Sequence, residues 1–208
     1  MGLFGLFHKK PAKKATPAKT IDKAAQIRAQ QQEDDKKYNR ELAMLQRAEA
    51  DYKIDKDLEK VIRTYQSVLD GVTWNAFNYQ KKLAAYYTKA AKYDDAWRVL
   101  SQAQHDAVKR GHGPACTGQI RMEQFKVLKA QKKYKQALET LCRAYVVNNA
   151  PYGTWNRESF IKNAKTCAKE MGLSEQQLDG IADLVGNAIS KQDKSETNIR
   201  QAFSNFLK

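Results

Sequence analysis

Apolar residues recur along much of this chain with the spacing of an α-helix. Two stretches share one order of residue types, Tyr, Ala, Leu and Ala, separated by three, four and three positions. They are Tyr93, Ala96, Leu100 and Ala103 in the first stretch and Tyr134, Ala137, Leu141 and Ala144 in the second. Such intervals place all four side chains on one face of a helix. Runs that alternate apolar and polar residues between glycine turns, which would predict strands, do not occur. The pattern predicts an all-α protein built from amphipathic helices.

A second helix is predicted immediately before the first of these stretches. Leu83, Ala84 and Tyr87 lie upstream of Ala96 and share one helical face. Small side chains such as Ala84 and Ala96 let two helices approach closely, and larger side chains on either side fill the remaining space. Residues 77–110 are therefore predicted to form one helical hairpin.

The combined spacing resembles one unit of the tetratricopeptide repeat (TPR), a helix–turn–helix of about 34 residues. In that family, hairpins stack into a curved solenoid with a concave binding side. A single hairpin leaves its apolar face uncovered, so the resemblance implies neighbours that stack on it. It predicts antiparallel helical hairpins stacked as a short TPR-like solenoid, with C-terminal capping helices.

The two neighbouring units match the family pattern in part. Upstream, Glu49 stands where a small residue is expected, and downstream Gln124 and Phe125 replace the expected leucine and small residue. Segment 111–118 has three glycines and a proline and lengthens the interval to the third unit, so it is predicted to be an irregular loop. The alternative fold is a helical bundle without repeats. The matching positions are Leu45, Tyr52, Val61, Tyr65 and Val68 upstream, and Leu128, Tyr134, Ala137, Leu141 and Ala144 downstream.

Three further helices are predicted after Pro151. Gly172 ends the first of them, and Ser174 with Gln177 forms a capping box at the start of the second. Apolar residues in the last helix follow the spacing of a buried face. These helices are expected to close the end of the repeat array; alternatively, the last helix binds a partner. Its apolar residues are Ile199, Ala202, Phe203, Phe206 and Leu207.

The predicted domain organisation has four parts. Residues 1–20 are a flexible basic tail, and residues 21–36 are a polar helical lead-in or a linker. Residues 37–150 hold the TPR-like repeats, and residues 151–208 are the capping helices. No apolar stretch has the length that a transmembrane helix needs, and the apolar start of the chain lacks the order of a secretory signal.

The tail combines a small apolar cluster with many lysines, which leaves three interpretations open. The apolar side chains can enter a lipid headgroup layer while the lysines meet anionic lipid, which would place the protein peripherally at a membrane. The tail can also be a disordered basic arm, or a short motif that docks on a partner protein. The residues concerned are Leu3, Phe4, Leu6, Phe7, Lys9, Lys10, Lys13 and Lys14.

The chain as a whole is strongly basic. Lysine and arginine number 37 against 23 acidic residues, which gives a net charge of +14. Such a charge favours anionic partners, namely acidic protein segments, nucleic acid or an anionic membrane surface, although it also serves general solubility. No recognised nucleic-acid-binding motif accompanies it.

No arrangement of residues predicts catalysis or a bound cofactor. The sequence has no Gly-rich phosphate loop, HExxH motif or nucleophile signature, so the protein is predicted not to be an enzyme. Cys116, Cys142 and Cys167 are odd in number and far apart, which predicts a reducing cytoplasm rather than disulfides. His105, His112 and Cys116 lack the spacing of zinc ligands, so no metal site is expected.

The TPR resemblance implies a binding groove lined by the first helix of each unit. Carried onto this chain, the groove positions are mostly cationic. They predict charge-steered binding of an acidic protein segment, and therefore a non-enzymatic adaptor or scaffold for protein–protein interaction. Nucleic-acid binding is the alternative function, and a merely solvated helix face is a third interpretation. The groove positions are Arg47, Lys53, Asn78, Lys81, Lys82, Lys89, Met122, Lys126 and Lys129.

The membrane interpretation of the tail makes a measurable prediction. Deleting residues 1–20 should reduce co-sedimentation with vesicles that contain anionic lipid, because each lysine near such a surface contributes about 1 kcal/mol. Vesicles of neutral lipid are the control. Equal pelleting of the full chain and the deletion variant would exclude the tail as a membrane anchor.

Overall fold

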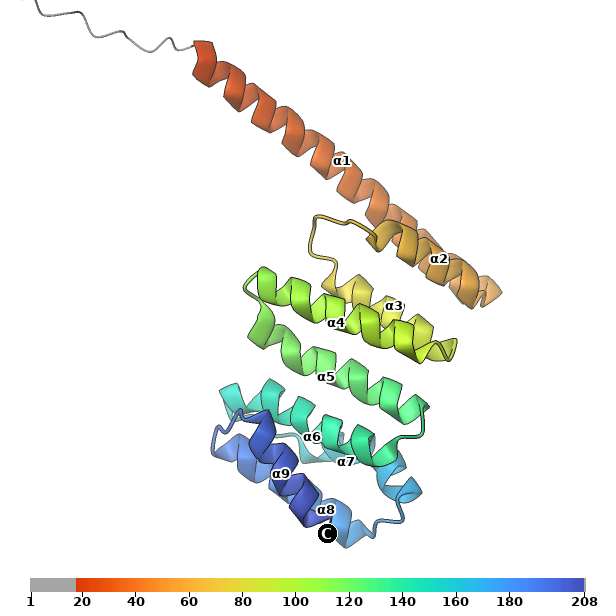
Figure 1. Ribbon diagram of the computed structural model, residues 1–208, viewed down its shortest axis with the longest axis vertical. Coiled ribbons are helices and arrows are strands. Elements are labelled where there is room, and N and C mark those ends of the chain that lie inside the picture. Colours follow the sequence, from red (N-terminus) through yellow and green to blue (C-terminus); the bar gives the residue numbers. More distant parts are fainter. Residues whose placement is uncertain (1–17, 208) are drawn as a thin grey trace, which may run out of the picture. The chain divides into compact units, whose positions relative to one another are not determined.

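The computed structural model describes residues 18–207, apart from the side chains of residues 18–22 and 113–115 (Figure 1). Every regular element in this part of the chain is helical and none is a strand, so the all-α prediction is confirmed. None of these helices combines the length and the apolar character that crossing a bilayer requires. The elements are α1 (Ala18–Asp55), α2 (Leu58–Leu69), α3 (Phe77–Lys89), α4 (Tyr93–Lys109), α5 (Gly113–Ala130), α6 (Tyr134–Asn149), the 3₁₀ turn η1 (Ala150–Tyr152), α7 (Arg157–Glu170), α8 (Glu175–Ser190) and α9 (Glu196–Phe206).

The chain divides into two compact units, Met1–Ala43 and Met44–Lys208. The described part of the first unit is the N-terminal part of α1, and almost all of its side chains are exposed. Ion pairs lie along its surface, such as the one that joins Lys37 Nζ to Glu41 Oε1 at 3.8 Å. Such pairs support an exposed helix weakly. Residues 21–36, predicted as a helical lead-in or a linker, are helical.

Within the second unit, the hairpin predicted for residues 77–110 corresponds to α3, a short turn and α4, and the two helices pack against each other. Ala84 is 1% exposed and Ala96 is fully buried, as expected for small residues where two helices meet. Leu100 is fully buried as well, and Tyr87 is 2% exposed. The apolar stripes of both helices therefore form part of one core.

The turn after α3 recurs after α5 with the same backbone hydrogen bonds. In both turns, three successive amides donate back into the last turn of the helix, and the middle residue has a positive φ, 56° at Ala91 and 59° at Lys132. This is the geometry that commonly ends a helix. The same hydrogen bonds and a positive φ also occur after α4, α7 and α8, at Gly111, Gly172 and Gln192, so this turn is a general way in which helices of this chain end. The donors Ala90, Ala91 and Lys92 bond to the carbonyls of Tyr86, Thr88 and Tyr87, and the donors Gln131, Lys132 and Lys133 to those of Val127, Lys129 and Leu128.

The prediction of an irregular loop over residues 111–118 is wrong. Helix α5 begins at Gly113 and has a proline in its first turn, where the missing amide proton breaks no helical hydrogen bond. Gly118 lies inside this helix, and a Cβ there would be 1.9 Å from Oδ1 of Asn148 on α6. This glycine therefore serves the close approach of two helices rather than a turn. The longer repeat interval reflects helices of 17 and 18 residues, α4 and α5, against 13 residues in α3.

Helix α5 contributes to two hydrophobic cores. Ile120 and Val127 belong to the core formed with α2, α3, α4 and the C-terminal part of α1, whereas Phe125 and Leu128 belong to the core formed with α6 to α9. Phe125 stands where the family pattern expects a small residue, and it is only 3% exposed. Two buried faces on one helix join the two cores into a single unit.

Two boundaries of the C-terminal helices, the end of α7 and the start of α8, lie where the sequence predicts. Gly172 follows α7 with a φ of 69°, and Ser174 with Gln177 forms the capping box of α8. In α9, Ile199 and Phe203 are buried in the core shared with α6 and α8. The apolar face of the last helix therefore packs within its own chain, although Phe206 at its end is 40% exposed.

Leu100 provides a test of the core between α3 and α4. Leu100→Ala removes a fully buried side chain and leaves a cavity, so the free energy of unfolding should fall by about 2–5 kcal/mol. Val108→Ala on the same helix is the matched control: Val108 is 59% exposed, and its change should stay within about 0.5 kcal/mol. Urea denaturation followed by circular dichroism measures both. Equal losses in the two variants would contradict the assigned burial.

Candidate functional site

The nine predicted groove residues come from three helices of the second unit. Two lie on α1, four on α3 and three on α5, and α3 and α5 contact each other. Each of these helices is the first helix of a predicted hairpin. The exposed ones are Arg47, Lys53, Asn78, Lys82, Lys89 and Lys126, and the half-buried ones are Lys81, Met122 and Lys129.

Four of the nine residues line one hollow between α3 and α5, with a volume of about 550 Å³. These four are Asn78, Lys81, Lys82 and Lys126. The rest of the lining consists of Tyr79, Ala85 and Glu123. The structure therefore brings three lysines from two helices together around one concavity. The five predicted residues that do not line it are Arg47, Lys53, Lys89, Met122 and Lys129.

Each lysine of the hollow already has a polar partner. Lys126 Nζ lies 2.8 Å from Oε1 of Glu123, and Lys82 Nζ lies 2.6 Å from Oε1 of Glu49. Lys81 Nζ donates to Oε1 of Gln119 at 2.5 Å, and burial lowers the pKa of Lys81 although Glu123 opposes this. Three ammonium groups thus face two carboxylates. The side chains of Lys82 and Lys126 are themselves 48% and 55% exposed, so an incoming anion can reach both ammonium groups.

Aromatic rings lie under several of the groove lysines. The ammonium groups are 4.8 to 5.5 Å from the ring centroids, close enough for cation–π attraction. Such rings hold the lysine stems against the helices. This role was not predicted from the sequence, although a lysine three or four positions after an aromatic residue indicates such a contact on a helix. The pairs are Lys81 with Phe77, Lys82 with Tyr79, Lys89 with Tyr52 and Tyr86, and Lys129 with Phe125.

Glu49 stands where the TPR pattern expects a small residue, and the structure shows how its larger side chain is accommodated. Its Oε1 accepts hydrogen bonds from the hydroxyl of Tyr65 on α2 and from the ammonium of Lys82 on α3. Tyr65 is fully buried, and a buried tyrosine hydroxyl generally requires such a partner. One carboxylate therefore connects α1, α2 and α3 beside the hollow.

This environment changes the acidity of both groups. Burial raises the pKa of Glu49, but the hydrogen bonds from Lys82 and Tyr65 and the charge of Lys82 outweigh it, so the pKa is lowered overall. Burial and the neighbouring carboxylate both raise the pKa of Tyr65. Glu49 is therefore ionised and Tyr65 neutral near pH 7.

A second charged cluster holds α9 in place. Glu196 accepts from Nε of Arg121 on α5 at 2.8 Å and from Nε of Arg143 on α6 at 2.8 Å. Burial raises the pKa of Glu196, but the two arginines lower it overall. All three side chains are at most 26% exposed. This cluster fixes the last helix against α5 and α6, so its charges are committed within the fold.

The other candidate functional groups in the described part of the chain are possible metal ligands and the cysteine thiols. Among the described residues, no three His, Cys, Asp or Glu side chains are placed to hold a metal ion. Cys142 and Cys167 are buried, burial raises the pKa of both thiols, and neither forms a disulfide. The predicted tail contacts, Leu3, Phe4, Leu6, Phe7, Lys9, Lys10, Lys13 and Lys14, lie outside the described residues.

Comparison with known proteins adds no family assignment. No family model, curated protein or solved structure matches the chain. What the protein does must therefore be inferred from the geometry and charge of its own residues.

The Glu49 cluster predicts a pH-dependent contribution to stability. Because the pKa of Glu49 is lowered by folding, its carboxylate stabilises the folded state above the ordinary pKa of 4.5 and loses this effect as the pH falls through the folded pKa. Glu49→Gln should lower the free energy of unfolding by about 1–2 kcal/mol at pH 7. The difference from the unmodified protein should shrink below about pH 4.5.

Urea denaturation at a series of pH values measures this effect. Glu59→Gln is the matched control. Among the described residues, Glu59 forms an ion pair only with Lys92, at the surface, so this substitution should change the free energy of unfolding by less than about 0.5 kcal/mol. A difference between Glu49→Gln and the unmodified protein that stays constant from neutral to acid pH would contradict the assigned role of the carboxylate.

Proposed function

We propose that this protein is a non-enzymatic adaptor that binds an acidic segment of a partner protein in the hollow between α3 and α5. In this proposal, its antiparallel helical hairpins stack as a short TPR-like solenoid, and the first helix of each hairpin faces the ligand. The observation that carries the proposal is the convergence of Lys81, Lys82 and Lys126 on one concavity of about 550 Å³.

Two features support the solenoid part of the proposal. The small residues Ala84 and Ala96 are buried where α3 meets α4. Each hairpin also contacts the next, since α2 packs on α3 and α4 packs on α5. Repeated hairpins with continuous contacts are the arrangement expected of a repeat protein.

The chemistry of the hollow favours a peptide ligand with carboxylates. A side-chain carboxylate can take the place of Glu123 beside Lys126 while the aromatic rings keep the neighbouring lysines in position. Apolar lining from Tyr79 and Ala85 lets the same site contact a peptide backbone or a methylene group. Affinity would come from a few charge-assisted contacts, which suits regulated, reversible binding.

Nucleic acid fits this surface less well. Glu49 and Glu123 lie beside the lysines and would repel a continuous phosphate backbone. The rings of Phe77 and Tyr79 have lysine ammonium groups over them, which leaves them poorly placed to stack on bases. The free cysteines suit a reducing compartment, so we place the adaptor in the cytoplasm.

Neutralising the hollow tests the proposal. The variant Lys81→Gln, Lys82→Gln and Lys126→Gln should bind a fluorescein-labelled glutamate-rich peptide about tenfold or more weakly than the unmodified chain, since three contacts of about 0.5–1 kcal/mol are lost. Glutamine is used rather than glutamate because a glutamate at position 82 would repel Glu49. Fluorescence anisotropy at near-physiological salt measures the affinity.

The matched control removes the same charge elsewhere. Arg63→Gln, Lys109→Gln and Lys135→Gln change exposed residues on α2, α4 and α6, the second helices of the predicted hairpins. This control should retain most of the affinity. Equal weakening in both variants would show non-specific attraction to a basic protein. Tighter binding of a single-stranded oligonucleotide than of the peptide, with a steep salt dependence in filter binding, would favour the nucleic-acid alternative.

A further inference from the structure

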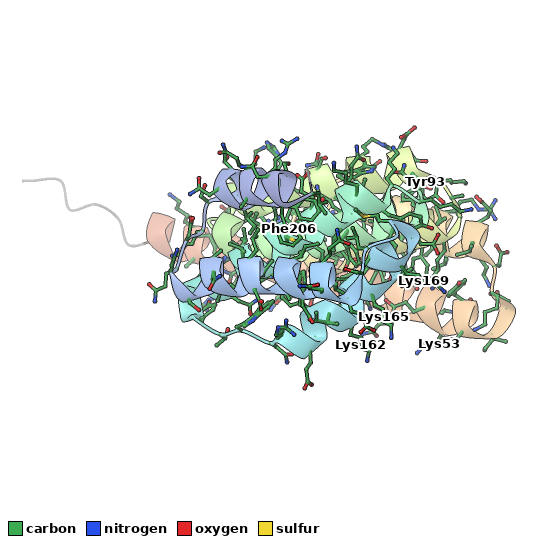
Figure 2. The ribbon with its side chains drawn as sticks, turned by 90° about the horizontal axis from the view of Figure 1, so that it is seen from below. Lys53, Tyr93, Lys162, Lys165, Lys169 and Phe206 are labelled. Carbon is green, nitrogen blue, oxygen red and sulfur yellow. The ribbon has the colours of Figure 1, made fainter. Side chains whose placement is uncertain are left out.

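A second hollow, the α5–α6 hollow, lies where residues of α5, α6, η1, the segment 191–195 and the start of α9 come together. Its volume is about 740 Å³, which is within the usual size of a ligand site. Helices α8 and α9 lie side by side and both contact α6, so they hold the segment between them beside α6 (Figure 2). The hollow is therefore built from elements that pack on one another.

The α5–α6 hollow adjoins the α3–α5 hollow. Gln119 of α5 lines the α5–α6 hollow, and its Oε1 accepts a hydrogen bond at 2.5 Å from Nζ of Lys81, which lines the α3–α5 hollow. Glu123, which also lines the α3–α5 hollow, follows Gln119 by one helical turn and shares its face of α5. The Lys81–Gln119 pair therefore lies at the border of the two hollows, and a bound segment can extend from one to the other.

The two hollows differ in charge. Three lysines and one glutamate line the α3–α5 hollow, whereas the α5–α6 hollow has one charge of each sign, on Lys194 and Glu196. Glu196 already accepts hydrogen bonds from Arg121 and Arg143. The α5–α6 hollow therefore offers little net attraction to a carboxylate, and it suits a neutral side chain better.

Apolar groups of the lining are exposed to solvent. Tyr152 on η1 is 78% exposed, Pro151 beside it is exposed, and Val147 on α6 is half-buried. Among the described residues, no other aromatic ring contacts that of Tyr152, and its side chain has no hydrogen bond. Exposed apolar groups gathered at a concavity mark a contact surface, and an aromatic ring packs well against another ring.

The floor of this hollow is preformed. Gly118 lies between the lining residues Thr117 and Gln119, and a Cβ there would be 1.9 Å from Oδ1 of Asn148 on α6. The close approach of α5 and α6 thus fixes the two helices at this point. Because the elements are already in place, little conformational entropy is lost when a side chain enters.

We infer that the α5–α6 hollow receives an aromatic side chain of the same acidic segment. This inference rests on the proposed binding at the α3–α5 hollow. Gln119 and Lys126 are seven positions apart on α5, which corresponds to about 10 Å at 1.5 Å per residue. An extended chain advances about 3.3 Å per residue, so about three residues separate the aromatic residue from the acidic cluster.

The two contacts would have different roles. The lysines of the α3–α5 hollow attract the acidic cluster and steer its approach. The aromatic ring adds an apolar contact of defined shape, which a segment with carboxylates alone cannot make. The protein would thereby distinguish its partner from other acidic segments.

Two pairs of fluorescein-labelled peptides test the inference on the full chain. Each peptide has a block of about four glutamates, a Gly/Ser spacer of about three residues, and then tryptophan in one member of the pair or serine in the other. The second pair has the reverse order, so that both chain directions are covered. In at least one order, the unmodified chain should bind the tryptophan peptide about tenfold more tightly than the serine peptide, because the ring is removed from water.

Tyr152→Ser should lose most of this advantage and leave the affinity for the serine peptide unchanged. Tyr152→Phe should keep the advantage, because the ring remains. Val108→Ser on α4 is the matched control, since Val108 is 59% exposed and lines neither hollow, and it should keep the advantage as well. Fluorescence anisotropy measures the affinities, and thermal melting by circular dichroism confirms that each variant is folded.

Each other outcome overturns a definite statement. If the unmodified chain shows no advantage in either order, or if Tyr152→Ser keeps it in full, the aromatic contact is refuted while binding at the α3–α5 hollow stands. If the variant at Lys81, Lys82 and Lys126 binds the serine peptides as tightly as the unmodified chain does, the proposed function itself fails. If analytical ultracentrifugation shows a dimer that Tyr152→Ser dissociates, the α5–α6 hollow is an interface between copies of this chain and the inference is wrong.

Discussion

Close contact between neighbouring helices is the constraint on which the rest of this structure depends. Each helix of the second unit has an apolar stripe too large to leave in water, and small residues decide how near the next helix can come. Ala84 and Ala96 serve this role between α3 and α4, and Gly118 serves it between α5 and α6. Helix α5 is buried on two faces and therefore joins the core of α2, α3 and α4 to the core of the helices from α6 to α9.

The cationic surface follows from this packing. The apolar faces of α3 and α5 are used by the cores, so the lysines are left on the remaining surface of these helices, where they lie around a shared hollow. Aromatic rings and two glutamates then restrain and partly neutralise them. The result is a surface with oriented charges, which is the physical basis of the proposed binding of a carboxylate-rich segment.

Much of the fold could be predicted because its signals are local. Helix spacing, the capping box at Ser174 and the helix end at Gly172 depend on residues within a few positions of each other, and all three predictions are confirmed. The prediction of a loop around Gly118 was wrong because the role of this glycine depends on a residue far away in the sequence. A glycine that avoids a clash with Asn148, far away in the chain, has the same local appearance as one that makes a turn.

By itself, the sequence determined that the chain is helical, which faces of its helices are apolar, and where a few of the helices end, since these depend on short-range periodicity and capping. Only the tertiary structure decided which charges meet. It placed Glu49 between Tyr65 and Lys82, and it brought lysines from α3 and α5 around one hollow. Partners of a charged group are set by distance in space, and that distance is fixed by the packing of helices far apart in the chain.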